Sequence, residues 1–265
     1  MQIAQALQRR QIPERPVVHL DDSPPILRDV AAACALHSQG ACLRLGSEEQ
    51  DPNPSVSAGQ LARVLNATGL GTLDIDLLID FMVIDSARNV TRCVPLGLSM
   101  LSWAASMGPW RSITLASGAF PRSISGLQSG AVTTLPRYDA IFFANVLSAG
   151  PQIQPDYGDY GINYPVMGPT PPRAPKPNLR YADGLVWQVD REDRMLPGNN
   201  SFFTVCSRAV RSGYWAGINF SLGDTEIERC SRSVGSPGAP TQWLSYGASH
   251  HLATVVDRLA TLGVP

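Results

Sequence analysis

Three short stretches combine residue types that could carry out acid–base or ligand chemistry. Residues 154–165 (QPDYGDYGINYP) hold two carboxylates, three tyrosines and two glycines, which is unusual for a core strand or a solvated linker. Residues 219–224 (NFSLGD) and 249–251 (SHH) each end an apolar run. Together the stretches supply carboxylates and imidazoles, the groups that general acid–base catalysis and metal binding use most.

Four residues of these stretches are the candidate catalytic groups: Asp159, Asp224, His250 and His251. A structural role is the alternative for each carboxylate, because Asp159 could hydrogen-bond the backbone of its own turn and Asp224 could cap a helix. The two histidines are adjacent, and on a strand they would point to opposite faces. We therefore expect at most one of them in a shared site.

Arg180 lies between apolar neighbours on a predicted strand. A buried lone guanidinium is costly, so it needs an anionic partner. Either Asp159 or Asp224 neutralises it in an internal network, which we favour, or a substrate phosphate or carboxylate does. Tyr160 and Tyr181 are the candidate aromatic contacts to the substrate, with loop packing as the alternative for Tyr160.

Other polar residues are expected to be structural. His19 stands alone on an apolar strand and is interpreted as a core residue with its hydrogen bonds satisfied. Asp74, Asp76 and Asp80 share one face of a predicted strand, and we expect that face at the surface. The odd number of cysteines, five, with no metal-type spacing, indicates free thiols in a reducing cytoplasm, with Cys230 the least buried.

Composition excludes several classes of partner. The chain has 265 residues, a net charge of −1 and only 16% charged residues, so no nucleic-acid footprint is visible. No apolar run reaches the ~18–20 residues of a membrane span, and the N-terminus does not resemble a signal peptide. We expect a cytoplasmic protein whose partner, where it has one, is another protein or a second copy of itself.

Strand-like and helix-like segments alternate along the chain, which is typical of a parallel sheet covered by helices. Residues 179–189 predict a β-hairpin turning at Asp183-Gly184, and the proline-rich residues 165–178 predict an extended loop. Strands are predicted at 16–20, 41–45, 73–85, 111–117, 152–156, 218–222 and 244–249, a helix and a turn at 1–15, and helices at 27–38, 57–67, 94–107, 138–147, 202–211 and 251–262.

Polar residues recur after most of the predicted strands. An (α/β) barrel gathers such residues at the C-terminal ends of its strands, where its active site lies. No Gly-rich phosphate loop follows the first strand, which disfavours a dinucleotide-binding sheet. The pattern predicts an α/β fold, a (βα)8 TIM-barrel-like single domain over residues 1–265.

Several of these motifs resemble the phage T4-type beta protein family. The resemblance covers roughly residues 74–262 and is carried by FSLGD (220–224), DYGINYP (159–165), SHHL (249–252), RSITLASGAFP (111–121), LPR (135–137) and NLRY (178–181). It implies a barrel-like α/β protein of phages and bacterial genomes. It implies fold and context rather than a reaction.

The sequence departs from the family in one respect. Family members usually begin with a strand and a helix that bear a Lys and a Glu, before the segment equivalent to residues 17–20. This sequence shows no such opening. We therefore expect a barrel that is missing or modified at its N-terminal strand, without the site residue that this strand normally supplies.

Two functional hypotheses follow. The first is an enzyme in which Asp159, Asp224, a histidine and Arg180 bind a divalent cation and hydrolyse a phosphate ester, although the spacing matches no zinc motif. The second is a non-catalytic interaction protein in phage–host conflict, with the loop at 165–178 as a contact surface. A catalytic site would bring these residues together at a cavity, whereas a binding protein would satisfy them internally and expose an apolar patch elsewhere.

Overall fold

The computed structural model describes residues 2–166, 168, 176–193 and 196–265. The chain forms two compact units, residues 1–117 with 145–159 and residues 118–144 with 160–265. Each unit is therefore built from two separate parts of the chain. The single-domain expectation stays a prediction, and most of the proline-rich loop at 165–178 lies outside the described residues.

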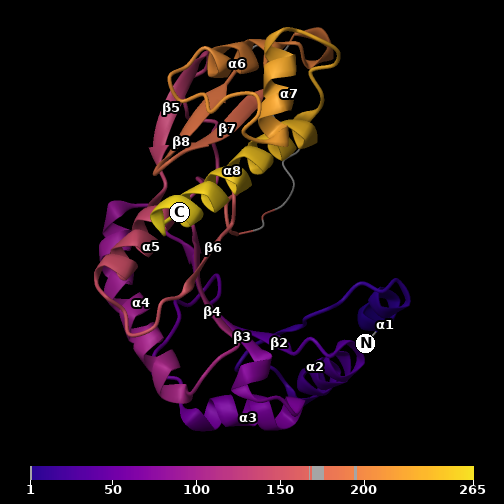
Figure 1. The fold of residues 1–265 in the computed structure, drawn as a ribbon, viewed down its shortest axis with the longest axis vertical. Coiled ribbons are helices and arrows are strands. Elements are labelled where there is room, and N and C mark those ends of the chain that lie inside the picture. The colour runs from indigo at the N-terminus through magenta and orange to yellow at the C-terminus, as the bar shows by residue number, and fades with distance from the viewer. Residues whose placement is uncertain (1, 167, 169–175, 194–195) are drawn as a thin grey trace. The chain divides into compact units, whose positions relative to one another are not determined.

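The first unit is built on a five-stranded parallel sheet, and its elements from α1 to β4 are shown in indigo to magenta in Figure 1. The strand order is β1-β2-β3-β4-β6. The elements are α1 (Gln2–Arg9), β1 (Val17–Val18), α2 (Pro24–His37), β2 (Ala41–Leu45), α3 (Ala58–Thr68), the 3₁₀ helix η1 (Thr72–Asp74), β3 (Ile75–Val83), α4 (Ala87–Met107), β4 (Ser112–Gly118) and β6 (Asp156–Asp159).

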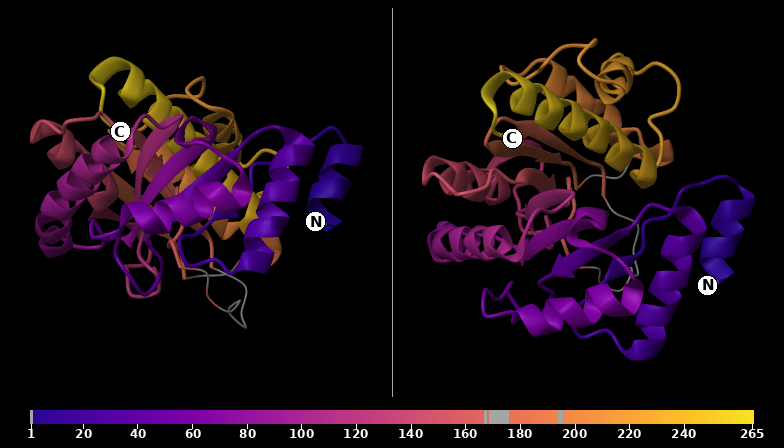
Figure 2. Two further views of the ribbon diagram at one scale, coloured as in Figure 1. Left: turned by 90° about the horizontal axis from the view of Figure 1, so that it is seen from below. Right: turned by 60° about the horizontal axis from the view of Figure 1, so that its bottom comes forward.

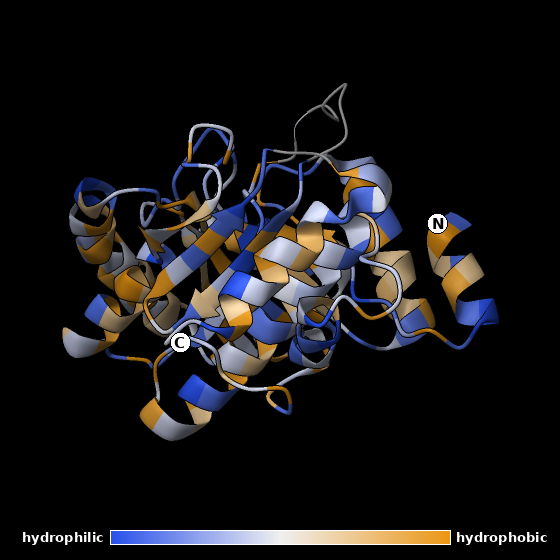
Figure 3. Ribbon diagram, turned by 90° about the horizontal axis from the view of Figure 1, so that it is seen from above, coloured by the Kyte–Doolittle hydropathy of each residue, from blue (hydrophilic) through white to orange (hydrophobic). Residues whose placement is uncertain are grey.

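Local sequence signals explain the boundaries of these elements. Ser57 caps α3, since its hydroxyl accepts from the backbone N–H of Gln60 while the Gln60 side chain accepts from the Ser57 N–H. Pro24 opens α2, where a missing N–H costs nothing. Figure 2 shows α1 beside α2, and Figure 3 shows that α1 carries both hydrophobic and hydrophilic residues.

The second unit is built on a three-stranded antiparallel sheet with the order β5-β8-β7. The predicted β7–β8 hairpin forms, and its two turn residues are Gly184 and Leu185, between the paired residues Asp183 and Val186. The elements are β5 (Ala131–Pro136), β7 (Asn178–Asp183), β8 (Val186–Arg191), the 3₁₀ helix η2 (Pro197–Asn199), α6 (Ser201–Val210), α7 (Leu222–Ser231) and α8 (Pro240–Leu262), while α5 (Tyr138–Ser148) runs from this unit into the first.

Two hydrophobic clusters hold the second unit together. Leu179 and Tyr181 on β7 pack with Phe202 of α6, Ile227 of α7 and Trp243 of α8. A separate cluster contains Phe120, Ile162, Ala182, Trp187 and Val189. Neighbouring residues of β7 therefore contribute to different clusters, as the alternation of a strand requires.

The structure confirms an α/β fold but does not confirm a closed barrel. The described strands form two separate open sheets, one parallel and one antiparallel. Residues 131–136 form a strand that the sequence did not predict. The strand predicted at 152–156 instead begins at Asp156 and pairs with β4.

Two other predicted strands do not form: residues 218–221 are a turn before α7, and residues 244–249 are helical. Residues 218–222 lead into α7, because the Ser221 hydroxyl accepts from the backbone N–H of Asp224 at 3.1 Å and caps a helix. Residues 244–249 lie within α8, whose buried positions Trp243, Gly247, His250 and Thr254 follow helical spacing. The apolar residues of this segment are too few to distinguish the two periods.

The cysteines are free thiols, and four of the five are buried. Cys230 is fully buried with Cys206, which corrects the expectation that it is the most exposed. Burial raises the pKa of the Cys206 thiol. None of the helices in the described part of the chain has the length and apolar character of a membrane span.

Candidate functional site

Asp224, His250 and Tyr181 meet in the interior of the second unit. Asp224 lies in the first turn of α7, His250 lies on α8 and Tyr181 lies on β7. Each is at most 1% exposed. The structure thus brings together two candidate catalytic residues and one candidate substrate contact.

The Asp224 carboxylate is surrounded by hydrogen-bond donors. The hydroxyl of Tyr181 donates to Oδ1 at 2.8 Å, and the hydroxyl of Ser221 donates to Oδ2 at 2.6 Å. The Nδ1 of His250 lies 3.0 Å from the same Oδ2. On the other side of the imidazole, Nε2 lies 2.8 Å from the carbonyl oxygen of Ala182.

These contacts fix the protons of His250. A carbonyl oxygen only accepts, so Nε2 must carry a proton. The hydrogen bond between Nδ1 and Asp224 needs one further proton. With the proton on Nδ1 the two residues are an imidazolium–carboxylate ion pair, and with the proton on Asp224 both are neutral. In both forms His250 has no free lone pair. It cannot take a proton from a substrate without breaking one of these bonds.

Tyr181 encloses this pair. Its ring stacks on the imidazole of His250 with the centroids 3.5 Å apart and the planes 19° apart. Its hydroxyl also accepts from the backbone N–H of Ala216 at 3.1 Å. Burial, with a contribution from the nearby Asp224 charge, raises the pKa of the Tyr181 phenol, so the hydroxyl remains a donor to Asp224.

His251 enters a different part of the interior. Successive helical residues are rotated by about 100°, so both histidines can be buried on separate sides of α8. The His251 ring lies 5.0 Å from the ring of Trp187, and the residue is 1% exposed. The sequence analysis assumed that the two histidines lie on a strand, where only one of them could face inward. They lie on a helix, so this expectation does not apply.

Arg180 lies on β7 next to Tyr181 and is half-buried. Its Nη1 donates to the carbonyl of Ile162 at 2.6 Å and to Oδ1 of Asn163 at 3.2 Å. The guanidinium carbon lies 4.5 Å from the centroid of the Phe120 ring. No carboxylate pairs with Arg180 within the described residues, and burial lowers the pKa of its guanidinium to about 10.

The remaining candidates lie near residues 154–165. Asp159 ends β6 in the first unit, where its Oδ2 accepts from the hydroxyl of Tyr157 at 3.0 Å. Tyr160 begins the next part of the second unit and packs closely on Gly118, at which a Cβ would lie 3.0 Å from the Cβ of Tyr160. Convergence of Asp159 with Asp224 stays a prediction, because the two belong to different units.

The donor groups do not form a ready metal site in the part of the chain that the structure describes. Among these residues, no group of three or more His, Cys, Asp and Glu side chains is placed to hold an ion. Asp224 and His250 contact each other, but their remaining contacts are hydroxyl groups and a backbone carbonyl. We therefore derive no step through a metal.

The sequence matches the family model described as Beta protein over residues 1–257. The chain belongs to the Beta protein family. Comparison with curated proteins and with solved structures found no significant match. The family resemblance seen in the motifs at 111–121, 159–165 and 220–224 is therefore confirmed over most of the chain.

This Beta protein family member has a second candidate site, which its sequence did not indicate. The first unit contains a cavity of about 270 Å³ whose lining includes His19, Asp21, Arg44, Gln50 and Gln60. His19 was expected in the core, but its side chain is 42% exposed and borders this cavity. Its position directly after β1 was the available signal, since C-terminal strand ends often carry ligand sites.

Proposed function

We propose that this protein binds a small organic anion, a phosphate or carboxylate ester, through Arg180. The observation that carries the proposal is a half-buried guanidinium without a carboxylate partner among the described residues. Removing such a charge from water is expensive unless an anion compensates for it. Two partners were expected for Arg180, an internal acid or a ligand anion, and of the internal acids Asp224 is already hydrogen-bonded to three other side chains.

The surroundings of Arg180 suit a positioned anion-binding group. Nη1 is held by Ile162 and Asn163, and the guanidinium lies over the Phe120 ring, so few conformations are open to the side chain. A guanidinium that is already ordered loses little entropy when it binds an oxyanion. Nε is buried without a hydrogen-bond partner, and Nη2, which has none within the described residues either, is the donor that we assign to the ligand.

Hydrolysis of a phosphate ester is the reaction that we propose for the bound anion. Such a step needs a base with a free lone pair, and the hydrogen bonds of His250 leave it none. The base would therefore be a group other than His250. This part of the proposal depends on an activity measurement, whereas anion binding by Arg180 can be tested without one.

Calorimetric titration with phenyl phosphate and benzoate tests the binding step. We expect Arg180→Met to weaken binding about tenfold or more, and Arg180→Lys to weaken it less because the charge remains. Arg232→Met is the matched control, since Arg232 is an exposed arginine paired with Glu228 on α7. Equal binding in the wild type and Arg180→Met, or no binding of either anion, would overturn the proposal.

Hydrolysis of p-nitrophenyl phosphate tests the reaction, measured with and without Mg²⁺ or Mn²⁺. We expect turnover that falls in Arg180→Met and is kept in Arg232→Met. Anion binding without turnover would retain the binding function and reject hydrolysis. Circular dichroism of each variant separates loss of a ligand contact from loss of the fold.

A second candidate function is a non-catalytic interaction protein in phage–host conflict. It is supported by the closed hydrogen bonding of Asp224 and His250, since a binding protein can use such groups as internal structure. It is also supported by exposed apolar residues of α1 and α2, Ile3 and Ile26. Absence of both anion binding and turnover would favour this candidate.

A further inference from the structure

A cavity in the first unit has the form of a small ligand site. It has a volume of about 270 Å³ and lies where β1 and β2 end and α3 begins. In α/β proteins, ligands bind in the crevice outside the carboxyl ends of parallel strands. The volume is slightly below the ~300 Å³ at which pockets for drug-sized molecules begin, so the ligand must be small.

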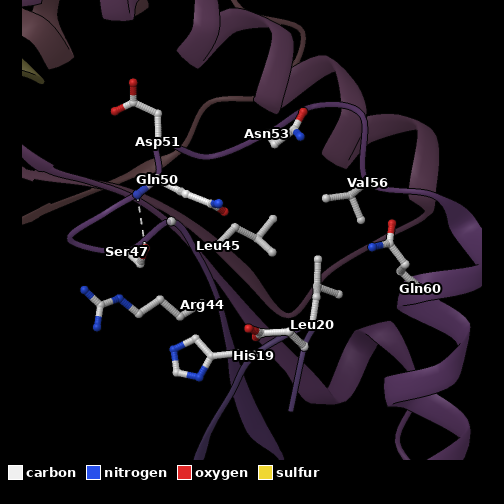
Figure 4. Close-up of a pocket in the computed structure, with 12 residues that line it drawn as sticks. His19, Leu20, Arg44, Leu45, Ser47, Gln50, Asp51, Asn53, Val56 and Gln60 are labelled. Carbon is white, nitrogen blue, oxygen red and sulfur yellow. Dashed lines mark hydrogen bonds between the residues drawn. The ribbon is translucent and has the colours of Figure 1, made fainter. Parts of the chain in front are cut away.

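The lining separates into an apolar part and an amide part. Figure 4 shows Leu20, Leu45 and Val56 lying between the amide side chains of Gln50 and Gln60. An apolar surface flanked by amides accommodates the face of a flat ring and hydrogen-bonds its edge.

The amides mainly offer donors to the cavity. Oδ1 of Asn53 already accepts from the backbone N–H of Ser55 at 2.9 Å, and Oε1 of Gln60 accepts from that of Ser57 at 2.9 Å. Their NH₂ groups are left without a partner among the described residues, as is the whole side-chain amide of Gln50. The matching ligand edge is therefore rich in carbonyl oxygens.

The charged residues of the cavity disfavour an anion. Arg44 donates to the buried Asp80 through Nε at 2.9 Å and through Nη2 at 2.8 Å, and Asp51 pairs with Arg92. Asp21 has no cationic partner among the described residues. A carboxylate at this position repels a phosphate and accepts hydrogen bonds from hydroxyl groups.

We propose that this cavity binds a neutral nucleoside with a carbonyl-rich base, such as uridine. The base lies against Leu20, Leu45 and Val56, its carbonyl oxygens accept from the amide side chains, and the sugar hydroxyls donate to Asp21. This ligand is uncharged and its site lies within the first unit. The proposal is therefore independent of anion binding at Arg180.

Calorimetric titration of the full chain with uridine, uridine monophosphate and glucose tests the assignment. We expect uridine to bind, the monophosphate to bind more weakly because of Asp21, and glucose not to bind. Gln50→Met and Asp21→Asn should each weaken uridine binding about tenfold, as the loss of a ligand hydrogen bond does. Asp21→Asn should also reduce the preference for uridine over its monophosphate.

Exposed residues elsewhere provide matched controls. Gln5→Met on α1 and Asp257→Asn on α8 repeat the two chemical changes away from the cavity and should leave uridine binding unchanged. No uridine binding at millimolar concentration would overturn the proposal. Binding of glucose instead, tighter binding of the monophosphate, or unchanged affinity in Gln50→Met would also overturn it.

Discussion

At the scale of single residues, the second unit depends on how Asp224 is neutralised. A carboxylate with no exposure to water is stable only when its oxygens are hydrogen-bonded or paired. Asp224 has three such contacts, from Tyr181, Ser221 and His250. These residues join β7, α7 and α8, so the same contacts that neutralise the charge also connect the elements of the unit.

Removing the Tyr181 hydroxyl tests whether the hydrogen bonds to Asp224 stabilise the second unit. Tyr181→Phe removes the donor to Asp224 and the acceptor of the Ala216 N–H, leaving both groups buried with one partner fewer. We expect a loss of about 1–3 kcal/mol in the free energy of unfolding, measured by urea denaturation. Tyr164→Phe, which loses a hydroxyl that makes no hydrogen bond within the described residues, is the control. Equal stability of the two variants would contradict the role of this hydroxyl.

Asp76 in the first unit leads to a prediction about how the stability of the protein depends on pH. Its Oδ1 accepts from Nε of Arg111 at 2.7 Å and from the hydroxyl of Ser112 at 2.8 Å, and the Arg111 contact lowers the pKa of the carboxyl below its usual 3.8. A carboxyl whose folded pKa is lowered stabilises the fold above its unfolded pKa and loses this contribution as the pH falls through the folded value.

Asp76→Asn should therefore destabilise the protein near neutral pH, by about 1–3 kcal/mol. The difference from the wild type should shrink below about pH 4, because the wild-type carboxyl then becomes protonated as well. Urea midpoints from pH 2.5 to 7 measure both effects, with exposed Asp257→Asn as the control. A difference that stays constant over this range would show that the Asp76 charge does not contribute.

For these residues, the sequence indicated which side chains are unusual but not all of their contacts. The sequence marked Asp224, a histidine pair and Arg180 as unusual, and the structure places Asp224, His250 and Tyr181 in mutual contact. It could not show that the Ala182 carbonyl occupies Nε2 of His250, because a backbone group has no sequence signature. Asp80 was expected at the surface but is 1% exposed and paired with Arg44, a partner 36 residues away.

At the scale of elements, the sequence predicted a helix or strand correctly where the residues that specify it lie within the segment itself. The strand at 41–45 was placed correctly and the hairpin turn to within one residue, because alternating residues and turn residues lie within those few positions. Residues 244–249 were assigned to a strand because their small and aromatic residues fit both periods. Their helical conformation depends on contacts of α8 with β7 and α7, which are distant in sequence.

Gly247 tests the contact of α8 with β7. A Cβ at this position would lie 2.5 Å from the backbone oxygen of Arg180 and 3.2 Å from Cδ1 of Ile162. Alanine normally stabilises a helix by about 1 kcal/mol over glycine, so helix propensity and packing predict opposite signs. We expect packing to win, because the closer atom is backbone and cannot rotate away.

Gly247→Ala should lower the free energy of unfolding by about 1–3 kcal/mol, measured by urea denaturation. Gly213→Ala is the matched control, since no atom lies within 4 Å of a Cβ at that position. Its stability should remain within about 0.5 kcal/mol of the wild type. A more stable Gly247→Ala variant would mean that α8 can move away from β7 at little cost.

At the scale of the whole molecule, the sequence predicted the class of fold but not how its strands are grouped. Alternating strands and helices indicated an α/β protein, and the parallel order β1-β2-β3-β4-β6 agrees with it. A closed barrel was inferred from polar residues after strands, and an open sheet collects polar residues at the same edge. Strand pairing depends on long-range contacts, so local patterns could not distinguish the two architectures.

The path of the chain leads to a prediction about fragments. The second unit takes Phe120, β5 and the first part of α5 from residues 118–144 and the rest from residues 160–265. β5 pairs with β8 from Ala131 with Arg191 to Pro136 with Val186. Phe120 packs edge-on against Trp187, with ring centroids 5.5 Å apart. A fragment of residues 160–265 therefore exposes β8 along one edge and leaves Trp187 partly uncovered.

We expect this fragment to lose the near-ultraviolet circular dichroism and blue-shifted fluorescence of a buried Trp187, even though it contains most of the second unit. A fragment of residues 118–265 is the comparison, because it restores both β5 and Phe120. Native-like spectra from residues 160–265 alone would contradict the structural role of the earlier segment. Native-like spectra from residues 118–265 would replace the single-domain prediction with two domains, because that fragment lacks residues 1–117, on which a single cooperative domain would depend.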